Sequence, residues 1–155
     1  MAPIATLLNF AIAGTSGYSL YHSMQSIPNL RKYKDKAEKA AKGSSTAEKR
    51  LGDTRYTVAA GVAISVISFL GALHRLVFAS TAPTQRVFGL LWLVVLCLGE
   101  FAVGGYIQSF WADEKRVLLT DEYNESVSHH MEVMRLCDDL ACLWAVATVL
   151  AFLGY

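Results

Sequence analysis

Four long apolar segments divide this chain of 155 residues, and they constrain its fold more than any other feature. They cover residues 4–24, 56–79, 88–111 and 136–154, and each is close to the ~20 residues that an α-helix needs to cross a bilayer core. Within lipid, every backbone amide must find its partner inside the protein, and a helix satisfies that need by itself. We therefore predict an all-α fold: a polytopic membrane protein whose single domain, residues 1–155, is a bundle of four transmembrane helices.

The positive charges predict how this bundle is oriented. Of the 14 Lys and Arg residues, nine lie between the first and second segments and three between the third and fourth. Because Lys and Arg near span ends are retained on the cytoplasmic side, we expect the basic loop 25–55 and the acidic loop 112–135 in the cytoplasm, with both termini opposite. Asn124 begins a glycosylation sequon, Asn-Glu-Ser, which this orientation predicts to stay unmodified.

The N-terminal segment bears on targeting. No Lys or Arg precedes Arg31, whereas a secretory signal or a mitochondrial presequence needs early positive charge. We therefore expect residues 4–24 to remain as a permanent helix. The expected location is an ER-derived endomembrane or the plasma membrane, without presequence-directed import into the mitochondrial matrix.

The first loop is strongly basic, with a net charge of +5 from nine basic and four acidic residues. Pro28 can open a helix that runs to a break at Gly43, and Ser45 with Glu48 has capping-box spacing, which predicts a helix running from Ser45 into the second span. Basic side chains near an anionic leaflet gain about 1 kcal/mol each, so the loop is a candidate for binding anionic phospholipids. The candidate residues are Arg31, Lys32, Lys34, Lys36, Lys39 and Lys42. The alternative is a solvated loop whose charges only fix the topology.

One acidic residue, Glu100, lies deep within an apolar segment. At 1.5 Å per residue it is about 15 Å from the cytoplasmic end of its helix, near the middle of the membrane. The same depth in the neighbouring segments is reached by Thr15, Ser16 and Ser65, which predicts hydrogen bonds between these hydroxyls and a protonated Glu100. Arg75 lies too near the other end for a direct ion pair. Such a residue marks either a structural or subunit contact, or a site for a proton, lipid or substrate.

Two adjacent histidines and three cysteines are the other residues with metal-binding chemistry. His129 and His130 would project about 100° apart from a helix, so they cannot easily share one ion, and we expect a solvated pair. Cys137 and Cys142 have no ligand-spaced histidines beside them, and we expect them to be structural. The sequence predicts no metal, no cofactor and no nucleic-acid partner.

Part of the chain resembles a family of four-span membrane proteins. The stretches YTVAAGV at 56–62 and LWAVA at 143–147, with an aromatic and small-residue third span, are similar to MARVEL-type proteins. This resemblance implies a non-enzymatic protein that organises membrane domains, vesicle traffic or junctions. It also implies cytoplasmic termini, opposite to the orientation that the charges predict.

The long basic first loop and the predicted orientation are similar instead to microsomal glutathione transferases. Those enzymes bind glutathione with an Arg, Asn and Glu cluster in the second helix. Here the second segment offers Arg55, His74 and Arg75, with no Asn or Glu between them, so we assign no catalytic residues.

These observations favour a non-enzymatic organising or accessory subunit of a membrane assembly. Its expected partners are the lipid bilayer and other membrane subunits or a second copy of the chain. The alternatives are a small membrane enzyme acting on a lipid or thiol, and a lipid- or proton-handling subunit that uses Glu100.

Overall fold

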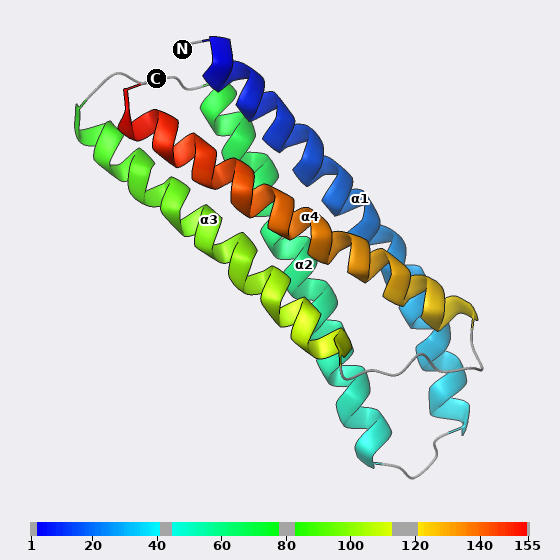
Figure 1. Ribbon diagram of the computed structural model, residues 1–155. Helices are drawn as coiled ribbons and strands as arrows, with labels where there is room; N and C mark the ends of the chain where they lie inside the picture. The colour runs from blue at the N-terminus through cyan, green and yellow to red at the C-terminus, as the bar shows by residue number, and fades with distance from the viewer. Residues whose placement is uncertain (1–2, 41–44, 78–82, 113–120, 155) are drawn as a thin grey trace.

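The structure is a computed structural model that describes residues 3–40, 45–77, 83–112 and 121–154. Each stretch contains one long helix: α1 Pro3–Ala40, α2 Ser45–Val77, α3 Pro83–Ala112 and α4 Asp121–Phe152. The helices alternate in direction, so that α1 begins, α2 ends, α3 begins and α4 ends at the same end of the bundle (Figure 1). No strand occurs in these stretches, and the predicted all-α fold is confirmed.

The helices do not all contact one another. α1 packs against both α2 and α4, and α4 also packs along α3. α2 and α3 contact each other less extensively, and the backbones of α1 and α3 do not come close within the described parts of the chain. The order around the bundle is therefore α2, α1, α4, α3, which decides which polar side chains can meet.

Two helix boundaries bear on the sequence predictions. α2 begins at Ser45 and runs without a break to Val77, as the capping-box spacing predicted. α1 does not end before Pro28, where we expected a new helix, but continues through this proline to Ala40. An interior proline removes one backbone hydrogen bond, and here good helix formers follow it and extend the helix for three more turns.

The inward face of α1 is largely polar, and large apolar side chains are exposed on the outside of the bundle. Buried positions of α1 recur every three or four residues, the spacing of one helix face, and most of them are polar. They are Ala5, Asn9, Ile12, Ser16, Ser19, Ser23 and Ser26. All four helices expose large apolar side chains, among them Phe10, Leu70, Leu98 and Val149. Large apolar side chains exposed on every helix are unusual for a soluble bundle, whose helices turn their apolar faces inward.

Two stretches are long and apolar enough to cross a membrane: Arg55–Val77 with 23 residues and Val87–Trp111 with 25. They lie in α2 and α3. Over the described residues, α1 and α4 do not reach the same apolarity, because α1 is rich in serine and α4 carries Arg135, Asp138 and Asp139. By length and composition, the bundle thus contains two candidate spans. The expected spans in α1 and α4 do not meet this criterion.

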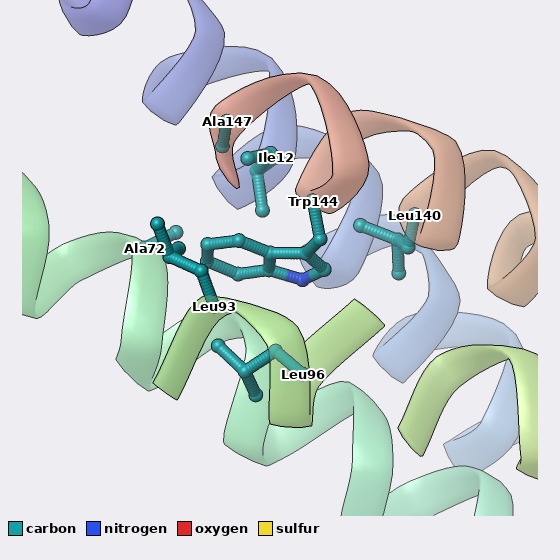
Figure 2. Packing of buried hydrophobic residues seen from close by; sticks show 7 residues of the cluster. All are labelled: Ile12, Ala72, Leu93, Leu96, Leu140, Trp144 and Ala147. Atoms are coloured by element: carbon teal, nitrogen blue, oxygen red, sulfur yellow. The ribbon is translucent and has the colours of Figure 1, made fainter. Parts of the chain in front are cut away.

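An indole ring fills the larger apolar cluster. Trp144 of α4 is fully buried, and its ring lies among side chains from the other three helices, including Ile12, Ala72 and Leu93 (Figure 2). The remaining members of this cluster are Leu96, Leu140 and Ala147. A second cluster contains Ile64, Ile107, Trp111, Val133 and Cys137. On α3, Glu100 lies between the residues of the two clusters.

Gly61 of α2 lies where the other three helices converge. A Cβ atom there would be 3.3 Å from Val133 Cγ1 of α4 and 3.7 Å from both Ile107 Cδ1 of α3 and Ser23 Oγ of α1. Gly105 of α3 instead faces outward, with nothing within 4 Å of such an atom. The packing therefore leaves no room for a large side chain at Gly61, whereas it leaves Gly105 open.

We predict that Gly61→Leu lowers the free energy of unfolding by about 1–3 kcal/mol, because the added side chain overlaps three neighbouring helices. Gly105→Leu is the matched control and should lose less than about 0.5 kcal/mol, since it projects into open space. Both variants gain the same helix propensity. Unfolding in detergent, followed by far-UV circular dichroism, measures the difference, and equal stabilities of the two variants would contradict the packing described.

Candidate functional site

Glu100 is the acidic side chain that the fold encloses completely, with 0% of its surface exposed. It belongs to the inward face of α3, on which Leu93, Leu96 and Ile107 are also buried. With buried Gly104, these positions follow one another at the three- and four-residue spacings of a single helix face. The apolar pattern of α3 thus turns the carboxyl group into the bundle.

A hydrogen-bond chain connects this carboxyl group to two other helices. Trp144 Nε1 of α4 donates to Ser68 Oγ of α2 at 3.1 Å, and Ser68 Oγ donates to Glu100 Oε1 of α3. An indole N–H can only donate, so the direction of the first bond is fixed, and the serine hydroxyl remains free to donate to the carboxyl oxygen. The chain therefore joins α4, α2 and α3 through polar contacts inside the apolar core.

The second carboxyl oxygen of Glu100 is different. Oε2 is buried and has no hydrogen-bond partner within the described chain. The Cys137 thiol of α4 lies beside the same carboxyl group. One turn further along α3, Gly104 packs so closely on α4 that a Cβ atom there would be 3.3 Å from Cys137 Cβ. A carboxyl group in this environment can hold a proton or accept a hydrogen bond, and it has one oxygen available for either.

The hydroxyls predicted to meet Glu100 lie elsewhere. Ser16 Oγ donates to Ile12 O of its own helix at 2.6 Å, and Ser65 Oγ is 2.8 Å from Ser19 Oγ of α1. Thr15 is half-buried on α1. Ser16 and Thr15 belong to α1, which lies diagonally across the bundle from α3, and Ser16 bonds within its own helix. The hydroxyl that Glu100 binds is Ser68.

Ser68 and Trp144 are the residues of this site that the sequence analysis missed. Ser68 lies three residues after Ser65, on the same inward face of α2, so the helical spacing offered a usable signal. Counting residues from the end of the segment pointed to Ser65. Such a count contains no information on how α2 is rotated about its axis. Trp144 gave no comparable signal, since its position among apolar residues is typical of a packing residue.

Two histidines that are far apart in sequence form a second polar contact. His22 Nδ1 of α1 is 2.9 Å from His129 Nδ1 of α4, and His130 beside it is buried against Trp111 at 5.5 Å between ring centroids. The expectation of a solvated pair at 129 and 130 is therefore wrong for His130, because α4 continues as a packed helix through this region.

Among the described residues, no group of three or more His, Cys, Asp or Glu side chains could hold a metal ion.

The basic candidates for phospholipid contact lie along the last third of α1. The helix carries Arg31, Lys32, Lys34, Lys36 and Lys39 on its continuation past Pro28, and Lys42 lies outside the described residues. They are on the far side of Pro28 from Ser16 and its neighbours, so this basic segment is separate from the buried polar site.

Comparison of the chain with protein-family models, with curated proteins and with solved structures finds no match.

We predict that Ser68→Ala lowers the free energy of unfolding by about 1–3 kcal/mol, because it leaves buried Trp144 Nε1 without an acceptor and Glu100 Oε1 without a donor. Ser16→Ala is the matched control: it also removes a buried hydroxyl, but one that bonds only to carbonyls of its own helix. We expect the control to lose less than about 0.5 kcal/mol. Denaturant titration in detergent compares the two variants, and equal losses would exclude a stabilising role for the chain of hydrogen bonds between helices.

Proposed function

We propose that this protein is a non-enzymatic integral membrane protein that crosses the bilayer four times and serves as an organising or accessory subunit of a membrane assembly. The observation that carries the proposal is the exposure of large apolar side chains on all four helices, while the polar residues of α1 face inward. On α1 and α4 the exposed set includes Leu7, Phe10, Val146, Val149 and Phe152. Lipid tails cover such a surface favourably, whereas water does not.

Several hydroxyls of α1 and α4 are compatible with a lipid environment. Ser16 Oγ donates to Ile12 O, and Thr148 Oγ1 donates to Trp144 O at 2.8 Å, so these hydroxyls bond within their own helices. Groups satisfied in this way need no water, which is the condition for placing them within a bilayer. This supports four spans although α1 and α4 are less apolar than α2 and α3.

The proposed orientation keeps the basic loop 25–55 and the acidic loop 112–135 in the cytoplasm, in an ER-derived endomembrane or the plasma membrane. α1 extends from the proposed span to Ala40, about 24 Å beyond Met24 at 1.5 Å per residue. The basic residues on this extension, Arg31 to Lys39, would therefore lie beyond the hydrocarbon core, where anionic phospholipid headgroups attract them.

A partner subunit or a second copy of the chain is expected to bind at α3. This helix packs closely on α4 and less extensively on α2, and it exposes apolar side chains along most of its length. The exposed set is Val87, Phe88, Leu91, Trp92, Val94, Val95, Leu98, Phe101 and Tyr106. The organising role also agrees with the resemblance to MARVEL-type proteins, although their cytoplasmic termini would require the opposite orientation.

We predict that a photo-crosslinking amino acid at Leu98, which is 62% exposed on α3, links the protein to another membrane subunit or to a second copy in intact membranes. The same probe at Leu7, an exposed leucine of α1, should give mainly lipid adducts, because α1 packs extensively against two helices whereas α3 packs extensively against α4 alone. Gel electrophoresis with mass spectrometry of the adducts measures this difference. Lipid adducts alone from both positions would contradict the accessory-subunit role.

A second candidate function is the handling of a proton or lipid at Glu100. The complete burial of this ionisable group favours it, because such a group is costly inside a membrane and by default marks a functional site. Glu100→Gln keeps the shape of the side chain and separates the two functions. Loss of assembly on a native gel supports the structural role, whereas loss of lipid turnover or proton uptake in an intact assembly supports the second.

A further inference from the structure

A half-buried arginine lies at the end of the bundle where α1 begins and α2 ends. Arg75 belongs to the last turn of α2, and its Nε donates to Asn9 Oδ1 of α1 at 3.2 Å. The carbonyl ends of the last helical turn favour a nearby cation, but they provide only a partial charge. A partly buried guanidinium normally needs a full counter-charge in addition.

Within the described parts of the chain, no acidic side chain supplies that charge. All 13 acidic side chains lie within residues 35–53, at Glu100, or within residues 113–139. Glu100 is the one that approaches this end, but it binds Ser68, which lies seven residues before Arg75 and hence about 10 Å away along α2. Among the described residues, Arg75 forms no ion pair.

The amide group that binds Arg75 also contains an unused donor. Asn9 is only 1% exposed, and its Nδ2 has no acceptor within the described chain. Because a guanidinium can only donate, the amide oxygen must face Arg75, which fixes the orientation of the amide. The Nδ2 donor belongs to the same small group and therefore lies within a few ångströms of the guanidinium. Two neighbouring donor groups thus lack an anionic acceptor.

The chemistry of this pair suits a phosphate. A guanidinium presents a planar set of N–H donors that matches phosphate oxygens, and an amide N–H adds a further donor. The flanking surface is apolar: Leu7 and Phe10 of α1 and Leu73 and Val77 of α2 are exposed. Acyl chains can lie along such a surface while the phosphate reaches the end of the bundle.

We propose that Arg75 and Asn9 form a binding site for the phosphate group of a membrane phospholipid. The site lies about 30 Å along α2 from Arg55, at 1.5 Å per residue, and is separate from the basic segment of α1. It rests on the proposed membrane location of the bundle, but not on the organising role or on a partner subunit.

The test uses the full chain purified in a maltoside detergent, which contains no phosphate, with a C-terminal tag that moves the terminal carboxylate away. Dioctanoyl phosphatidylglycerol is titrated at about 0.5 M NaCl, where exposed charges are screened, and binding is followed by the rise in Tm. Dioctanoylglycerol, which lacks the phosphate, and inorganic phosphate, which lacks the chains, are the control ligands.

Three variants are compared with the unaltered chain. Asn9→Asp preserves the side-chain shape and supplies the missing carboxylate, and Arg75→Gln removes the cation. Arg55→Gln, at an exposed position about 30 Å away along α2, is the control for loss of one positive charge. We expect the apparent Kd for phosphatidylglycerol to rise about tenfold or more in Asn9→Asp and Arg75→Gln and to stay unchanged in Arg55→Gln.

Each outcome decides the proposal. An unchanged Kd in Asn9→Asp, or the same Tm shift with dioctanoylglycerol, would overturn it. Saturation of the shift by inorganic phosphate alone would overturn the lipid assignment, leaving a site for free phosphate. If Arg75→Gln does not fold, Asn9→Asp still decides, because it is expected to stabilise the fold by pairing with Arg75. Failure of lipid binding would leave the number of spans and the accessory role untouched, since these are measured by other probes.

Discussion

The hydrogen bonds from Trp144 to Ser68 and from Ser68 to Glu100 are the interaction on which the arrangement of three helices depends. Without water, each of these groups must find its partner inside the protein. Their positions fix how α4, α2 and α3 are rotated about their axes, because rotating any one helix would leave a buried donor or acceptor unpaired. Apolar packing around the Trp144 ring then adds shape complementarity to a geometry that the polar groups have already restricted.

The same constraint explains the composition of α1. Its inward face is formed largely by serines, whose small side chains allow close approach. The hydroxyls of Ser16 and Ser26 bond to backbone carbonyls, and that of Ser19 bonds across to α2. In lipid, there is no hydrophobic drive between helices, so small residues and polar contacts must hold them together. A helix of only moderate apolarity, such as α1, can therefore pack well against the other helices of a membrane bundle. The low apolarity of α1 is therefore compatible with the proposed span.

Much of the fold could be predicted from the sequence, because helix signals are local. The four apolar segments predicted four helices, and the spacing of Ser45 and Glu48 predicted where α2 begins. The partner of Glu100 could not be predicted in the same way. Selecting Ser68 over Ser65 requires the rotation of α2 and the order of helices around the bundle, and both are set by contacts between distant segments. The pairing of His22 with His129 depends on the same long-range information, as does the Arg75 contact with Asn9.

The central claim is that lipid surrounds all four helices, and a measurement of accessibility on α1 and α4 tests it most directly. Spin labels at Phe10 of α1 and at Val146 of α4, both exposed in the bundle, report whether they collide with oxygen dissolved in lipid or with a water-soluble nickel complex. Labels at Leu70 of α2 and Leu98 of α3 provide the reference for the two helices that are apolar enough to span by composition alone. A four-span bundle predicts that the labels at all four positions collide preferentially with oxygen in reconstituted bilayers. Preferential collision of the α1 and α4 labels with the nickel complex would mean that water covers these helices, and it would contradict a four-span bundle.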